Sequence, residues 1–155
     1  MERVYNELTS IINSFYTKYK DLDENIASPQ PTDREWSPKE IIGHLIDSAS
    51  NNHQRFIRLQ LIDELIFPDY FPDNKRWVEI AHYTEMDFAD LLLLWKHYNL
   101  LIARIIRTVD PETLDNCWLL DGNKITLDFL IRDYLAHLQN HLQQFHDTVG
   151  HVNGR

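Results

Sequence analysis

The feature that most constrains the fold is a helical period of apolar residues, which recurs in separate segments of the chain. Within each segment, apolar side chains return at the three- and four-residue spacing that lines one face of an α-helix. Amphipathic helices bury their apolar faces most simply against one another, so the pattern predicts an all-α four-helix bundle. The predicted helices run from about Glu2 to Leu22, from Ser37 to about Leu59, from near Thr84 to Val109, and from Thr126 to about Val149.

Residue types that start and end helices support these boundaries. Residues 37–40 read Ser-Pro-Lys-Glu and supply an N-cap oxygen, a residue preset for the first turn and a reciprocal capping carboxylate. Thr84 with Asp87 forms a second candidate capping pair, and Thr126 is the expected N-cap of the last helix. Gly150 is expected to end that helix.

The segments between the predicted helices differ in character. Residues 23–36 contain two prolines among polar residues and predict a connecting loop. Residues 67–83 mix Pro, Asp and aromatic residues, and predict a long ordered crossover with a short helix near Trp77.

Before the last helix, the pair Asp121–Gly122 predicts a turn. Short strands around Trp118 and Lys124 are an alternative to irregular structure on either side of it.

Length and composition predict a single domain, residues 1–155, and make several partners poor candidates. A net charge of -9 without any basic cluster argues against nucleic acid. No apolar run approaches the length of a membrane span, and the first residues do not resemble a signal peptide, so we expect a cytoplasmic protein that does not bind membranes. Cys117, the only cysteine, excludes an intrachain disulfide and is interpreted as structural.

Histidines on two predicted helices are the strongest candidates for chemistry. His137 and His141 are four residues apart, so both imidazoles project from one side of a helix and could share a metal ion. Among 8 histidines, about 0.4 such pairs would arise by chance, so a solvated helix edge is the alternative. His44, at the edge of an apolar face, could supply a third ligand or could be a hydrogen-bonded structural residue.

Other charged residues and histidines lie near the candidate ligands or away from them on each predicted helix. Asp47 and Asp133 lie about one turn from a candidate ligand, and either carboxylate could orient an imidazole or could be a solvated surface group. His82, in the crossover, has no assigned role. The remaining histidines are predicted to be surface residues: His53, His97, His146 and His151.

Two sequence stretches carry a family resemblance. WSPKEIIGHLIDS, residues 36–48, together with DYLAHLQNHLQQF, residues 133–145, resembles the DinB-like superfamily of metal-binding bundles. The resemblance implies that His44, His137 and His141 bind one divalent metal ion, that the bundle runs up-down-down-up with a long crossover between helices two and three, and that the protein is a homodimer. Residues 52–61 and 68–83 resemble the YfiT-like branch, which includes metal-dependent thiol transferases related to the bacillithiol S-transferases.

Three functions follow as hypotheses. Three neutral imidazoles leave a coordination position for a small molecule, and the leading hypothesis is transfer of a low-molecular-weight thiol to an electrophile, with Trp77 and Tyr83 shaping the substrate cavity. The alternatives are a metal-dependent hydrolase and a non-catalytic module that binds a metal or ligand and dimerises. Imidazole ligands favour Zn or Ni, with Fe and Mn as further candidates.

Overall fold

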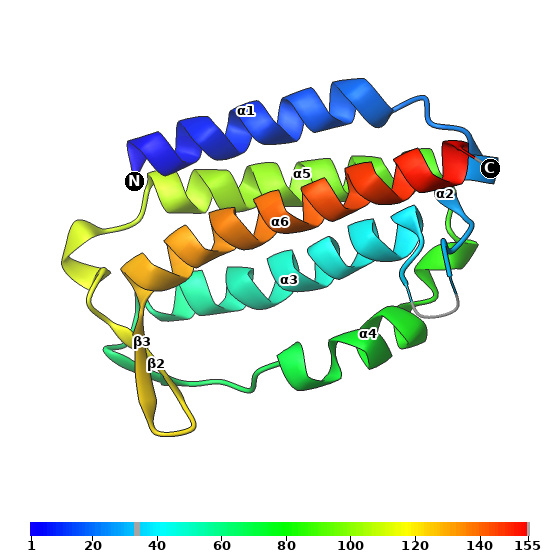
Figure 1. The fold of residues 1–155 in the computed structure, drawn as a ribbon. Helices are drawn as coiled ribbons and strands as arrows, with labels where there is room; N and C mark the ends of the chain where they lie inside the picture. The colour runs from blue at the N-terminus through cyan, green and yellow to red at the C-terminus, as the bar shows by residue number, and fades with distance from the viewer. Residues whose placement is uncertain (33–34, 155) are drawn as a thin grey trace.

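The computed structural model describes residues 1–32 and 35–154, and its long helices form a bundle (Figure 1). The four long helices are α1 (Glu2–Tyr19), α3 (Pro38–Arg58), α5 (Phe88–Arg107) and α6 (Leu127–Asn153). Shorter elements connect them: α2 (Glu24–Ala27), β1 (Glu64–Ile66), α4 (Asn74–Ala81), β2 (Cys117–Leu120), β3 (Asn123–Thr126) and 3-10 turns at Phe71–Asp73, Tyr83–Glu85 and Pro111–Thr113. The predicted four-helix bundle is therefore present.

The colours of Figure 1 show in which direction the chain runs through each helix. Helices α1 and α6 run one way along the bundle, and α3 and α5 run the other way. Two successive parallel helices need a connection that returns the chain to the starting end, and β1 with α4 lies in this crossover. The short helix expected near Trp77 is α4.

The prediction of an all-α protein was wrong in one respect, because the described residues contain a three-stranded sheet in the order β1-β2-β3. β2 pairs antiparallel with β3 across the predicted Asp121–Gly122 turn, where both residues have positive φ (49° and 81°). β1 pairs parallel with β2. A strand of three residues is too short to show an alternating pattern, which is why β1 was not predicted.

Several helix ends also differ from the prediction. Helix α5 begins at Phe88 and not near Thr84, because residues 83–85 form a 3-10 turn and the Asp87 side chain caps the helix by accepting from the backbone N–H of Asp90. Helix α6 continues through Gly150 to Asn153. Helix α1 ends at Tyr19, and the predicted loop after it contains the short helix α2 and residues 33–34, which lie outside the described residues.

Aromatic rings from three helices fill the centre of the bundle. Phe15 of α1 lies 5.1 Å from Trp95 of α5 and 5.0 Å from Phe145 of α6, measured between ring centroids. All three are buried, and each contributes on the order of 1.5–3 kcal/mol through removal of apolar surface from water. No helix among the described residues has a stretch long and apolar enough to cross a membrane.

Candidate metal centre

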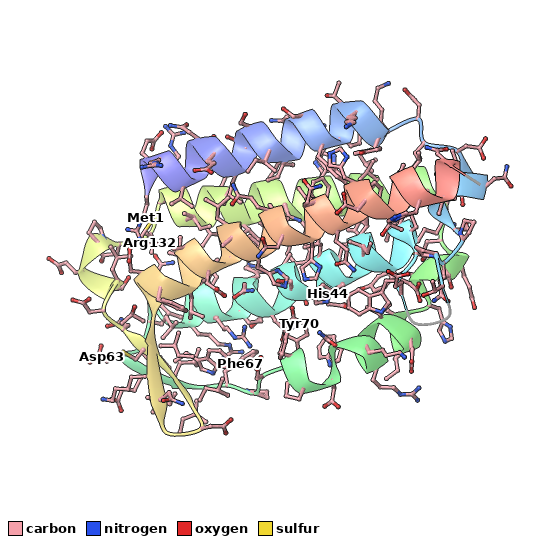
Figure 2. All side chains as sticks on the ribbon, in the orientation of Figure 1. Met1, His44, Asp63, Phe67, Tyr70 and Arg132 are labelled. Atoms are coloured by element: carbon pink, nitrogen blue, oxygen red, sulfur yellow. The ribbon has the colours of Figure 1, made fainter. Side chains whose placement is uncertain are left out.

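The three candidate histidines come together inside the bundle, between α3 and α6. Nε2 of His44 lies 3.3 Å from Nε2 of His137. The His141 ring centroid lies 4.5 Å from each of the other two, and one ring nitrogen from each residue lies within 4.8 Å of the others. His44, on α3, is labelled in Figure 2, and its contact with His137 places it against α6. His44 and His137 are 93 positions apart in the chain, so the cluster exists only in the folded protein.

Local structure fixes where α3 presents His44. The predicted capping box is confirmed, since the Ser37 side chain accepts from the Glu40 N–H while the Glu40 carboxylate accepts from the Ser37 N–H. The ring of Tyr83 lies against Gly43, where a Cβ atom would come within 2.1 Å of the ring. Glycine at position 43 therefore lets the crossover pack closely on α3 beside His44.

Two of the imidazoles have hydrogen-bond partners that orient them. Nδ1 of His141 donates to Oε1 of Gln144 at 2.8 Å, which leaves Nε2 as the nitrogen with a free lone pair. Nδ1 of His137 lies 3.5 Å from the Ser48 hydroxyl. Nδ1 of His44 is buried without a partner among the described residues.

Burial holds the imidazoles in their neutral form. Loss of solvation, together with repulsion from His141 and His137, lowers the pKa of His44 to about 3. The same loss of solvation, with repulsion from His141, lowers the pKa of His137 to about 4. Burial also lowers the pKa of His141, although its hydrogen bond to Gln144 opposes the shift. At neutral pH all three rings can offer a lone pair.

The donor set fits a divalent metal ion. Ligand nitrogens 2.0–2.1 Å from a tetrahedral ion are about 3.3 Å from one another, and this is the spacing of Nε2 of His44 and Nε2 of His137. Three imidazoles leave one tetrahedral position for a small molecule.

Helix α3 carries an unusual stripe of buried polar side chains next to the cluster. His44, Ser48, Asn52 and Arg55 recur at the spacing of one helix face, and all four are buried. Buried polar groups are costly, so a continuous stripe of them is more typical of a site than of a core. The stripe borders a cavity of about 190 Å³ that is also lined by His137.

The other residues proposed from sequence lie around the cluster without bonding to it. Asp47 is buried and accepts a 2.6 Å hydrogen bond from the Tyr83 hydroxyl. Asp133 is exposed and lines the 190 Å³ cavity. Neither carboxylate hydrogen bonds to an imidazole among the described residues, and the side chains that contact the ring nitrogens of His137 and His141 there are those of Ser48 and Gln144.

Trp77 and Tyr83 do not line the cavity beside His137. Tyr83 is buried between α3 and the crossover, and Trp77 lines a separate hollow of about 360 Å³ with Asp47 and Ile80. Apart from the other two histidines, the rings that lie against His44 are those of Trp36, at 4.9 Å between centroids, and Tyr70, at 6.2 Å. Trp36 directly precedes the capping box in the sequence, and this position was the one indication that its ring could lie near His44.

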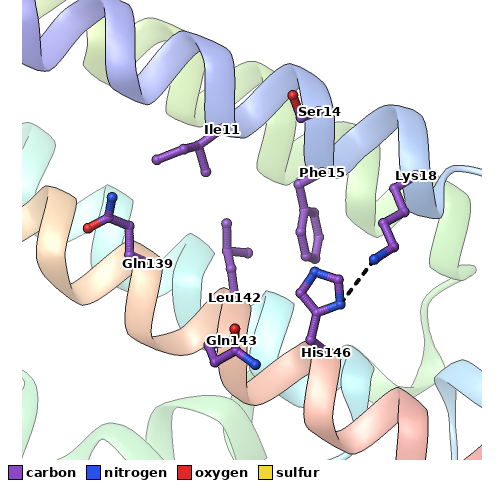
Figure 3. Close-up of a pocket in the computed structure, with 8 residues that line it drawn as sticks. All are labelled: Ile11, Ser14, Phe15, Lys18, Gln139, Leu142, Gln143 and His146. Atoms are coloured by element: carbon purple, nitrogen blue, oxygen red, sulfur yellow. Dashed lines mark hydrogen bonds between the residues drawn. The ribbon is translucent and has the colours of Figure 1, made fainter.

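Of the other histidines, His82, His97 and His151 are exposed. The surface prediction was wrong for His146, which is half-buried: its Nδ1 contacts the Tyr19 hydroxyl and lies 3.4 Å from Nζ of Lys18. It lines a hollow of about 340 Å³ between α1 and α6 (Figure 3). His53 is also half-buried, 3.4 Å from the Tyr98 hydroxyl.

Fold and site together define a helical bundle with a three-histidine cluster, in which His44 is buried and His137 and His141 are half-buried. The model of the DinB superfamily matches residues 9–145, and the chain belongs to this superfamily. No curated protein sequence matches. Among solved structures, the chain is similar to YfiT from Bacillus subtilis, with a TM-score of 0.75 and 18% sequence identity over 99% of this chain and 83% of that one. YfiT is described as a "probable metal-dependent hydrolase with an unusual four-helix bundle topology".

Proposed function

We propose that the protein is a metal-dependent enzyme in which His44, His137 and His141 hold one divalent ion and a low-molecular-weight thiol is transferred to a small electrophile. The observation that carries the proposal is the tetrahedral spacing of the His44 and His137 Nε2 atoms at the edge of a 190 Å³ cavity. A closed structural site would use four protein ligands, whereas the described residues bring only three metal-binding groups together here.

The metal ion and the side chains around it have separate roles in this proposal. A divalent ion in this position supplies Lewis acidity and lowers the pKa of a thiol or water that binds to it. Gln144 and Ser48 orient two of the rings, and burial keeps the rings unprotonated. The thiol proton leaves to solvent, the sulfur forms a bond to the electrophilic carbon, and the leaving group departs with its electron pair.

Hydrolysis is the second candidate, because water can occupy the same position as a thiol. The description of YfiT as a probable hydrolase favours it, although that relative shares 18% identity with this chain. Zn and Ni are the expected ions, and a homodimer stays a prediction.

The first test is metal content. Tag-free protein loaded with Zn²⁺ should hold about one ion per chain by mass spectrometry, and His44→Ala, His137→Ala and His141→Ala should each lose it while the helical circular dichroism persists. His97→Ala, an exposed histidine of α5, is the matched control and should retain the ion. A wild type that binds neither Zn²⁺ nor Ni²⁺ would contradict the proposal and favour a non-catalytic binding module.

The second test separates the two reactions. The loaded protein is assayed for thiol consumption with monochlorobimane and for cleavage of esters and amides. Thiol transfer that disappears in His137→Ala supports the proposed reaction, and ester or amide cleavage without thiol transfer assigns the site to hydrolysis.

A further inference from the structure

Arg55 is a buried cation close to the three-histidine cluster. It lies in the same polar stripe of α3 as His44 and lines the 190 Å³ cavity together with His137. Only 4% of the residue is exposed. Removing a charge from water costs several kcal/mol unless the charge is paired and fully hydrogen-bonded. The contacts of this guanidinium therefore show how far its burial is compensated.

The protein itself satisfies the guanidinium only in part. Nη2 donates to Oδ1 of Asp69 at 2.9 Å, and the group stacks 3.8 Å from the ring centroid of Trp118. Nε is buried and has no hydrogen-bond partner among the described residues, and no hydrogen bond within that part of the chain uses Nη1. A guanidinium carries five N–H donors, so most of its hydrogen-bonding capacity is unused.

The position of Arg55 sets its distance from the histidines. Ser48, which contacts His137, lies seven residues earlier on α3, or about 10 Å along the helix axis. The side chains of a helix generally lean toward its N-terminus, which on α3 is the direction from Arg55 to Ser48 and His44. A small molecule that is bound at the histidines could therefore extend along the stripe, past Asn52, to Arg55.

We propose that Arg55 forms an anion subsite and that the substrate or co-substrate carries a carboxylate some carbon atoms away from the group that binds the metal. This inference rests on the proposed metal site and adds the chemical class of its ligand. A carboxylate matches the planar fork of a guanidinium and would occupy donors that the protein leaves unused. Two carboxylates line the same cavity: Asp69, which is already paired with Arg55, and the exposed Asp133. Their negative charge would disfavour a second anionic group on the ligand.

The test compares charged and neutral probes of equal length. Co²⁺-loaded protein is titrated with 6-mercaptohexanoate and 6-mercapto-1-hexanol, and with 4-mercaptobutyrate and 4-mercapto-1-butanol. Binding of the sulfur is followed by the sulfur-to-cobalt charge-transfer absorption. In these probes the carboxylate is too far from the sulfur for a favourable small chelate ring, so a preference for the acid must come from the protein.

We expect wild-type protein to bind at least one of the acids about tenfold more tightly than its alcohol, the discrimination typical of a charge-assisted hydrogen bond. Arg55→Gln should remove this preference and leave affinity for the alcohols unchanged, and Arg55→Lys should restore part of it. Arg58→Gln, an exposed arginine one turn further on α3, is the matched control and should behave as wild type. A purely structural arginine would change both members of each pair equally.

The outcomes separate this inference from the function on which it rests. Failure of wild-type protein to bind Co²⁺ would overturn the metal site and the subsite together. Co²⁺ and thiol binding without any preference for the acids in the wild type would overturn the subsite alone. This comparison needs no variant and so remains decisive if Arg55→Gln does not fold.

Discussion

The hydroxyl of Tyr83 donates a 2.6 Å hydrogen bond to Oδ1 of Asp47, and this contact ties the crossover to α3 one turn after Gly43. The second oxygen of Asp47, Oδ2, is buried without a partner among the described residues. The carboxylate is therefore held in place by one bond but poorly solvated. Burial raises its pKa to about 6, although the bond from Tyr83 opposes the shift.

Replacing Asp47 by Asn should stabilise the metal-free protein at pH 7. The folded pKa of about 6 lies above the unfolded value of 3.8, so the folded state binds the proton more tightly and loses stability as pH rises from about 4 to 6. Asparagine keeps an oxygen for Tyr83 and removes the buried charge. We expect a gain of about 1–2 kcal/mol in the free energy of unfolding at pH 7, shrinking toward pH 4.

Urea unfolding of EDTA-treated protein at several pH values measures this gain. Asp133→Asn, at an exposed site on α6, is the control and should change stability by less than about 0.5 kcal/mol. A variant less stable than wild type at pH 7 would show that the charged form of Asp47 is favoured in the fold.

The histidine cluster should have the opposite pH dependence. Burial lowers the pKa of His44 to about 3 and that of His137 to about 4, both below the ordinary value of 6.5. The unfolded chain then binds more protons than the folded one, so the stability of the metal-free protein falls as pH decreases from 6.5 toward 4. Each ring contributes up to about 1.4 kcal/mol per pH unit in that window.

The His44→Gln/His137→Gln variant should have a flatter stability curve between pH 7 and 5 than wild type, measured in the presence of EDTA. The same pKa values imply that metal stays bound below pH 6.5, where exposed imidazoles would release it. Equal slopes for variant and wild type would mean that these rings are not neutral in the folded state.

Gln144 should influence metal affinity through His141. Removing its oxygen in Gln144→Ala frees Nδ1 of His141 to rotate and to change tautomer, and loss of such an orienting contact typically weakens metal binding about tenfold or more. Competition with a chromogenic chelator measures the affinity. The neighbouring Gln143→Ala removes a hydrogen bond to Asp147 and should leave the affinity unchanged.

Gly43→Ala should destabilise the protein by about 1–3 kcal/mol, because the new methyl group overlaps the ring of Tyr83, which must then shift. Gly150→Ala is the matched control, since nothing lies within 4 Å of a Cβ atom there and alanine is the better helix former. Chemical denaturation of the two variants gives the comparison. If Tyr83 is the cause, adding Tyr83→Ala to Gly43→Ala should cost less than the sum of the single changes.

The features that sequence analysis predicted well are local ones. The Ser37–Glu40 capping box involves residues three apart, and the shared direction of His137 and His141 follows from one helical turn, so neither depends on the rest of the fold. His44 was a candidate only by its position on an apolar face. That it faces the pair on α6 was implied by family resemblance and not by periodicity, which reports buried faces but not which helices adjoin.

The features that were missed depend on distant contacts. Thr84 resembles an N-cap, but packing of the adjacent Tyr83 on Gly43 accompanies a 3-10 turn there, and the helix begins later. Asp47 was predicted either to orient an imidazole or to be a solvated surface group, and it is instead buried and bonded to a residue 36 positions away. Ser48 could not be distinguished from other polar residues of its helix, because its role depends on His137 from α6.

The crossover also has a consequence for the order of events during folding. His44 and His137 come from helices that are separated along the chain by the whole crossover and by α5, so the complete ligand set forms only after those segments have closed a long loop. Of the three ligands, only His137 and His141 are close together in the sequence of the unfolded chain. Metal capture should therefore be a late step that follows assembly of the bundle and then slows its unfolding.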